Sequence, residues 1–245
     1  MNINVIMSDN RVLTEDYRKM HNLCAAVTQQ ICNDLNYEFT YYVPFSKKSK
    51  VHTCFNPTTQ APRHPAWSKV LACYQHLKNT PKCDLLVYLD TDAILLNTCL
   101  IENFAKKELN FSNDHPFKRE KINTGFIVLK KDNITFNLLE EWYKVNDRFD
   151  LLKRWEQVEI TNMAKRYNKN IYIDTSCVYL YNLKTKREEF SLNSLHFLKH
   201  FCGKFNQHNV LKQYLDSINF NIIDNIKVNS KQFCTDKYCT LKKYK

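Results

Sequence analysis

The sequence predicts a single α/β domain built on an open sheet flanked by helices. Over residues 3–89, short apolar runs alternate with amphipathic segments in the order strand, helix, strand, helix, strand. The chain has 245 residues, a length at which such folds often stay undivided. Hydrophobic residues make up 44% of the chain, which supports a packed core and excludes a disordered or collagen-like protein.

Local patterns place the elements of the first half. Continuous apolar runs predict buried strands, and apolar residues spaced by three and four predict amphipathic helices. The predicted elements are a strand at 3–7, a helix at 17–35, a strand at 37–45, a helix at 67–77 that stops before Pro81, and a strand at 85–89. Because ligands of open α/β sheets bind beyond the carboxyl ends of strands, Ser8 at the end of the first strand is a candidate ligand residue.

The second half is less regular, and its last part carries weak signals. The predicted elements are a strand at 122–129, helices at 136–145 and 156–167, and a short strand at 171–173. Past residue 205 the chain is dominated by Asn, Lys and isolated apolar residues. We therefore predict one domain over residues 1–205 and a peripheral extension over residues 206–245.

The net charge and the cysteine pattern limit the classes of binding partner and the cell compartment that we expect for this protein. Lys and Arg number 36 against 25 Asp and Glu, a formal charge of +11 that favours anionic partners such as nucleotides. The basic residues are scattered in short clusters, which is typical of solvated surface charge rather than of a nucleic-acid footprint. The 10 cysteines include no CxxC pair and indicate free core thiols. With no apolar stretch of membrane-spanning length and no signal-type segment, we expect a soluble cytoplasmic protein.

The most informative motif is Asp90-Thr91-Asp92, which stands between two apolar runs at a predicted strand end. A buried carboxylate needs a compensating charge, and no Lys or Arg lies within three residues. Residues two apart on extended backbone project to one side, so Asp90 and Asp92 can face one point while Thr91 faces away. Hard oxygen ligands of this kind suit Mg²⁺ or Mn²⁺ bound with phosphate oxygens. The alternative is an Asp-rich turn that caps local backbone groups.

Further motifs follow in a fixed order around this one. They are Arg63-His64-Pro65-Ala66-Trp67-Ser68-Lys69, Tyr88-Leu89-Asp90-Thr91-Asp92-Ala93, Ile122-Asn123-Thr124-Gly125-Phe126, Glu140-Glu141-Trp142, Trp155-Glu156-Gln157 and His200-Phe201-Cys202-Gly203-Lys204. In order and spacing the chain resembles the GT-A-fold glycosyltransferases, most closely their galactosyl-, mannosyl- and xylosyltransferase family, with a weaker likeness to the glycogenin-like family. The resemblance covers roughly residues 3 to 205 and implies a Rossmann-like domain with a mixed, mostly parallel sheet.

The resemblance also implies a metal centre. It makes Asp92 a direct ligand and Asp90 either a second ligand or a hydrogen-bond partner of the donor. His200 matches the third ligand, and imidazole ligation favours Mn²⁺ over Mg²⁺. A divalent metal would stabilise the charge that develops on a leaving diphosphate. Against this stands a structural role for His200, since His196, His200 and His208 lie close together in the sequence.

Donor-binding and catalytic roles follow from the same resemblance. The residues predicted to bind the nucleotide-sugar are Ser8, from its place at a strand end, and Arg63, Lys69, Asp90, Thr91, Asn123, Gly125, Gly203 and Lys204. The alternative for Lys69 is a solvated charge on a helix face. Glu156 and Gln157 match an acid and glutamine pair beside the reacting sugar and are the candidate catalytic residues. Gly125 also fits a plain strand bulge, and Glu156 also fits the start of a helix. An inverting enzyme would need a carboxylate base such as Glu156 or Glu159, whereas the resemblance favours retention.

The sequence therefore predicts a metal-dependent glycosyltransferase that moves a sugar from a nucleotide donor, most simply a UDP-sugar, to a sugar or protein hydroxyl. The Asn- and Lys-rich, Gly-poor composition suggests a cytosolic glycosylation system such as that of a large virus. Two alternatives are a haloacid-dehalogenase-like phosphotransferase, which also carries Asp-x-Asp after a strand, and a basic nucleic-acid-binding protein. A phosphotransferase of this class usually carries its Asp-x-Asp motif near the start of the chain. A nucleic-acid-binding protein would leave the paired carboxylates unexplained.

Overall fold

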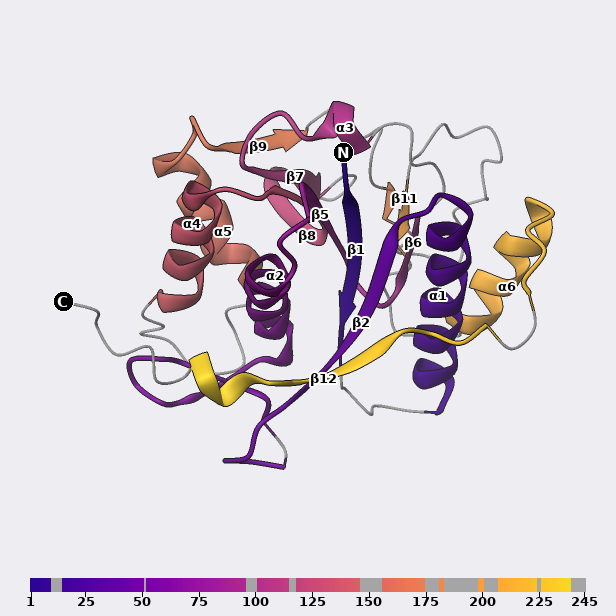
Figure 1. The fold of residues 1–245 in the computed structure, drawn as a ribbon, viewed down its shortest axis with the longest axis horizontal. Coiled ribbons are helices and arrows are strands. Elements are labelled where there is room, and N and C mark those ends of the chain that lie inside the picture. The colour runs from indigo at the N-terminus through magenta and orange to yellow at the C-terminus, as the bar shows by residue number, and fades with distance from the viewer. Residues whose placement is uncertain are drawn as a thin grey trace.

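The computed structural model describes residues 1–9, 15–50, 52–95, 101–114, 118–145, 156–174, 181–182, 198–200, 207–223 and 226–238. Within these ranges a central sheet lies between two layers of helices (Figure 1). One layer contains α1 (Glu15–Asp34) and α6 (Gln207–Ser217), and the other contains α2 (Ser68–Asn79), α4 (Asn133–Lys144) and α5 (Glu156–Arg166). The predicted α/β class and single domain are confirmed.

In the described ranges the main sheet has seven strands, in the order β12-β2-β1-β5-β8-β7-β9. Their bounds are β1 Ile3–Ser8, β2 Glu38–Phe45, β5 Leu85–Leu89, β7 Leu109–Asp114, β8 Lys118–Lys130, β9 Ile171–Asp174 and β12 Ser230–Cys234. Strand β8 runs antiparallel to its neighbours β5 and β7, and the other neighbouring pairs are parallel. The sheet is therefore mixed and mostly parallel, as the sequence led us to expect.

Smaller elements surround this sheet. Strands β6 (Ala93–Leu95), β10 (Tyr181–Asn182) and β11 (Leu198–His200) form a second sheet in the order β10-β11-β6. Strand β3 (Cys54–Phe55) pairs with β4 (Pro62–Arg63). The remaining helices are α3 (Ile101–Phe104) and the 3-10 turns η1 (Pro65–Trp67) and η2 (Thr235–Tyr238). Most of these were not predicted, because segments this short carry little periodic signal.

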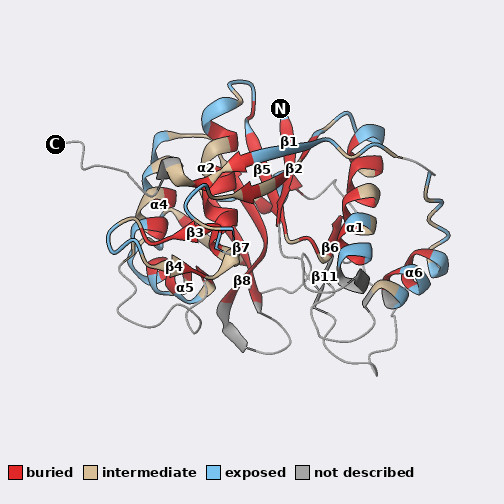
Figure 2. Ribbon diagram, turned by 90° about the horizontal axis from the view of Figure 1, so that it is seen from below, coloured by how far each residue is buried: buried red, intermediate tan, exposed pale blue. Residues whose placement is uncertain are grey.

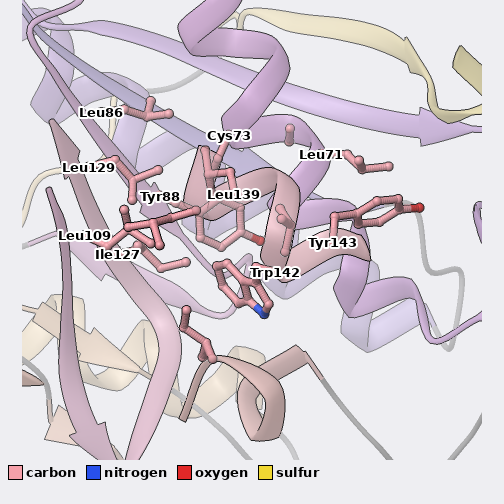
Figure 3. Packing of buried hydrophobic residues seen from close by; sticks show 14 of the residues in the cluster. Leu71, Cys73, Leu86, Tyr88, Leu109, Ile127, Leu129, Leu139, Trp142 and Tyr143 are labelled. Atoms are coloured by element: carbon pink, nitrogen blue, oxygen red, sulfur yellow. The ribbon is translucent and has the colours of Figure 1, made fainter. Parts of the chain in front are cut away.

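The sheet is apolar on both faces because helices cover both. Every residue of β1 and β5 is buried, as expected for parallel strands between two helical layers. Figure 2 shows buried residues through the sheet and exposed residues on the outer sides of α1 and α6. On the α2 and α4 side, Figure 3 shows Trp142 among the buried side chains, and its ring lies edge-on to Phe111 with centroids 5.9 Å apart.

The C-terminal part is more integrated into the fold than a peripheral extension would be. Strand β12 adds to the edge of the main sheet beside β2, and α6 packs on α1. Leu211, Tyr214 and Leu215 of α6 are buried in the same core as β1 and β5. The isolated apolar residues of this region are thus the buried face of a helix and of an edge strand. None of the described helices has the length and apolar character that crossing a bilayer requires.

Candidate active site

The Asp90-Thr91-Asp92 segment forms a tight turn between β5 and β6 at the carboxyl end of β5. The Asp90 N–H donates to the Gly125 carbonyl of β8 at 2.9 Å, and the Ala93 N–H closes the turn on the Asp90 carbonyl at 3.0 Å. Asp90 and Asp92 are partly exposed, whereas Thr91 is buried. The two carboxylates therefore reach the solvent side of the turn and Thr91 points inward.

A buried cation from α2 joins two carboxylates beside this turn. The Lys69 Nζ lies 2.8 Å from Asp90 Oδ1 and 2.9 Å from Glu156 Oε1. The ammonium also donates to the Thr124 carbonyl at 3.1 Å and lies 3.2 Å from its hydroxyl. The Thr124 hydroxyl in turn donates to Glu156 Oε1 at 2.7 Å. Three distant segments of the chain thus meet at one ammonium group.

The surroundings keep these groups ionised. Burial alone would lower the pKa of the Lys69 ammonium, but the Asp90 and Glu156 carboxylates outweigh burial and raise that pKa above its ordinary value. Burial alone would raise the pKa of the Glu156 carboxyl, but the Lys69 ammonium and the Thr124 hydroxyl hold it below its ordinary value. The motif suggested a metal as the charge that compensates Asp90. The structure shows that Lys69 already supplies a positive charge there.

Glu156 and Gln157 open helix α5. The Trp142 indole N–H donates to the Glu156 carbonyl at 2.9 Å, which fixes the start of the helix. Glu156 is the first residue of α5 and its carboxylate pairs with Lys69, so a helix-start position and the ion pair coexist. Its second oxygen, Oε2, is buried and has no hydrogen-bond partner among the described residues. Gln157 is partly exposed in the same turn.

Asn123 and Gly125 lie in an irregular part of β8. The pairing with β7 shifts after Phe111, which faces Ile127, so that the next residue of β7 already faces Asn123. The Gly125 N–H donates to Asn123 Oδ1 at 2.7 Å, and the Gly125 carbonyl holds the Asp90 N–H. Gly125 therefore lies in a strand bulge, which was one of the two predictions for this residue. The bulge supports the turn formed by Asp90-Thr91-Asp92, called the motif turn below.

Ser8 and Arg63, two other predicted residues, lie at different distances from the ion cluster of Lys69, Asp90 and Glu156. Ser8 is close: its carbonyl lies 3.4 Å from the Tyr88 hydroxyl, which also lies 3.2 Å from Asp90 Oδ1. Arg63 donates instead to the carbonyls of Tyr143 and Val145 at the end of α4, and its guanidinium lies 4.1 Å from the centroid of a Trp67 ring. These contacts give Arg63 a structural role in a buried position. The predicted residues Gly203 and Lys204 lie outside the described residues.

Several residues of the site were not predicted. Thr124 and Tyr88 contact the ion cluster, and the Thr91 hydroxyl contacts Asp9 and His21. Strand alternation did not identify Thr124, because it places Thr124 on the face opposite Asn123 and Gly125, and the bulge in β8 breaks that alternation. No local signal identifies His21, since its partner lies 70 residues away along the chain.

The residues around Asp92 fit a divalent metal in part. Burial raises the pKa of the Cys24 thiol and the nearby Asp92 charge raises it further, which puts the carboxylate close to α1. Strand β11 pairs with β6 so that the backbone of His200 faces Ala93, the residue after Asp92. Carboxylate oxygens with an imidazole suit Mn²⁺. The His200 side chain is not among those described, and the described side chains alone contain no group of three metal ligands.

Comparison of the sequence finds no matching family model and no matching curated protein. Comparison of the structure finds similarity over most of the chain to a glycosyltransferase involved in the glycosylation of the major capsid of PBCV-1. The TM-score is 0.63, with 12% identity over 87% of this chain and 100% of that one. The chain has the GT-A fold. A second solved structure, galactosyltransferase LgtC with donor and acceptor sugar analogues, gives a TM-score of 0.44 and 11% identity over 90% of this chain and 98% of that one.

The GT-A fold and the ion cluster lead to the same edge of the sheet. Asp90 follows the carboxyl end of β5, where open α/β sheets bind their ligands. Lys69, Asn123 and Glu156 reach this edge from α2, β8 and α5. The candidate site is therefore a mixed set of ionised and amide groups at the ligand-binding edge of a GT-A sheet.

Proposed function

We propose that this GT-A protein is a metal-dependent glycosyltransferase that moves a hexose or pentose from a UDP-sugar to a hydroxyl group of a glycan or glycoprotein. The observation that carries the proposal is the buried Lys69 shared by Asp90 and Glu156 next to Asp92. Ionised carboxylates accept hydrogen bonds only, and sugar hydroxyls donate them. A pair of carboxylates that share one buried lysine is therefore suited to orient a sugar.

Each group has a role that its position supports. Asp90, which is partly exposed, would accept hydrogen bonds from the donor sugar, and the buried Glu156 would hold Lys69 and Asp90 in place behind it. Asp92, with Asp90 and His200, would hold Mn²⁺ or Mg²⁺. The bound ion would act as a Lewis acid on the diphosphate leaving group. The bulge at Gly125 would bring backbone close to the sugar without a side chain in between.

The environment of Glu156 supports retention of configuration at the transferred sugar. A general base must take up a proton in the reaction, and its efficiency is greatest when its pKa lies near the working pH. Lys69 and Thr124 lower the pKa of Glu156 and occupy one of its oxygens, which makes it a poor base. We infer that Glu156 orients and stabilises charge, with Gln157 beside it, and that Glu159 is the candidate base only if the enzyme inverts.

The acceptor is proposed on the same basis. The enzyme with the similar fold takes part in glycosylation of a viral capsid protein. We propose that this chain likewise glycosylates a protein-borne glycan or a protein hydroxyl, in a cytosolic and viral setting, and that it does not bind nucleic acid. The lack of a bilayer-crossing helix among the described helices is compatible with this setting.

Calorimetric titration with UDP, with and without Mn²⁺, tests the proposal. We expect Mn²⁺ to tighten UDP binding at least about tenfold, and Asp92→Asn to remove that gain, because a charged ligand is lost. Asp84→Asn is the matched control, since Asp84 is exposed just before the opposite end of β5 and accepts from the Asn2 N–H at 2.7 Å. The proposal fails if UDP binds equally well without Mn²⁺, or if both variants behave alike. A phosphotransferase or nucleic-acid binder would not need UDP and Mn²⁺ together.

A further inference from the structure

The Thr91 hydroxyl is a buried meeting point of three elements. It donates to Asp9 Oδ2 at 3.1 Å, just past the end of β1, and lies 3.2 Å from His21 Nε2 on α1. All three residues are buried, with exposed fractions of 5% for Asp9, 4% for His21 and 2% for Thr91. Thr91 is the middle residue of the motif turn, so this contact ties the turn to β1 and α1.

The hydrogen bonds of this trio have one consistent direction. The Thr91 hydroxyl has a single hydrogen, and it donates that hydrogen to Asp9 Oδ2. The imidazole must then donate its Nε2–H to the hydroxyl oxygen. The other ring nitrogen, Nδ1, lies 3.9 Å from Asp9 Oδ2, so the ring spans the hydroxyl and the carboxylate. His21 therefore presents an N–H at one fixed position behind the turn.

The location of this network decides what it can do. The backbone of the turn is held on one side by β8, through the Asp90 N–H and the Gly125 carbonyl. The Thr91 side chain holds it on the other side, between the two acidic residues. Burying a hydroxyl, an imidazole and a carboxylate costs free energy unless each is hydrogen-bonded, and an apolar side chain at this position would avoid that cost. A directional bond, unlike an apolar contact, fixes the turn along one line.

We propose that His21 is a positioning residue for the metal-binding turn: through Thr91, and with Asp9 as the final acceptor, it fixes the backbone that places the Asp92 carboxylate on the metal. The inference rests on the proposed function, since it concerns the same metal centre. Groups that orient metal ligands from behind typically contribute tenfold to a hundredfold in metal affinity. Neither His21 nor Thr91 has to touch the ion for this effect.

Mn²⁺ binding, measured by electron paramagnetic resonance on the full chain at saturating UDP, tests the inference. Two matched pairs separate the hydrogen bond from the volume of the side chain. Thr91→Val and His21→Phe remove the polar group, whereas Thr91→Ser and His21→Gln keep a hydroxyl and an N–H donor. Thr235→Val is the control, because the Thr235 hydroxyl is equally buried and lies within hydrogen-bond distance of the Thr53 carbonyl and of the Phe45 carbonyl at the end of β2.

We expect Thr91→Val and His21→Phe to weaken Mn²⁺ binding about tenfold, Thr91→Ser and His21→Gln to stay within about threefold of the natural chain, and Thr235→Val to lose stability without losing Mn²⁺ affinity. Unchanged affinity in Thr91→Val, with only a lower melting temperature, would overturn the inference and leave the proposed function intact. If Thr91→Val does not fold, the His21 pair decides. If the natural chain binds Mn²⁺ no better than Asp92→Asn, both the proposed function and the inference fail.

Discussion

Removing the buried cation at the centre of the site should destabilise the whole fold. Lys69→Met keeps most of the side-chain volume and removes the ammonium, which leaves Glu156 buried without its partner. At 2.9 Å and an effective dielectric constant of about 20, the attraction between the two groups is about 6 kcal/mol before desolvation is subtracted. Breaking such a pair on one side typically costs about 3–5 kcal/mol in the free energy of unfolding.

A double-mutant cycle measures the part that belongs to the pair. We expect Lys69→Met to lose about 3–5 kcal/mol in urea denaturation, and Lys69→Met combined with Glu156→Gln to be at least about 2 kcal/mol more stable than the sum of the single changes. The second change removes the charge that the first leaves uncompensated.

A surface ion pair provides the matched cycle. Lys144 Nζ lies 2.7 Å from Glu140 Oε2, but the side chains are 45% and 32% exposed. The same substitutions there should show a coupling energy of no more than about 0.5 kcal/mol, because water screens the charges. If the Lys69 and Glu156 changes are additive within about 0.5 kcal/mol, the reasoning about the buried cluster is refuted.

Three further outcomes are expected. The contribution of Glu156 to the free energy of unfolding should be complete above its unfolded pKa and should be lost as the pH falls through its lower folded pKa. The contribution of Lys69 should be lost as the pH rises through its raised folded pKa. Urea denaturation measured at a series of pH values checks both. Asp132→Ala should cost about 1 kcal/mol, and Asp132→Asn much less, because Asp132 caps α4 by accepting from the Thr135 N–H. Cys24 should resist iodoacetamide until the protein is unfolded, as peptide mass spectrometry would show, because burial raises its pKa.

Local patterns predicted the elements that carry their own signal. The strands β1 and β5 and the helices α1 and α2 lie where the apolar spacing placed them, and Asp90 follows a strand end as expected. The order of these elements also fixed the α/β class. Strand β12 was not predicted, because a segment of five residues carries little pattern of its own. It forms an edge strand through its pairing with β2.

Several residues of the candidate site were named from the sequence, but the contacts between them were not. The search for a charge to balance Asp90 covered neighbours in sequence and found no cation, yet Lys69 reaches it from α2, the helix that precedes β5. Glu156 joins the same ammonium from the far half of the chain. Such contacts are set by how the crossovers return to the sheet, which local periodicity does not contain. The contact between His21 and Thr91 was not predicted for the same reason, because the two residues lie on segments far apart in the sequence.

The placement of the first strand decides how the protein can be attached to a surface. Strand β1 lies inside the sheet between β2 and β5 and runs parallel to β5, with Ile3 beside Leu85 and Met7 beside Leu89. Met1, which is 64% exposed, therefore lies at the end of the sheet opposite the Asp90 turn (Figure 1). A biotin or histidine tag joined at Met1 would hold the molecule on a sensor chip with its candidate donor site directed into the flowing solution.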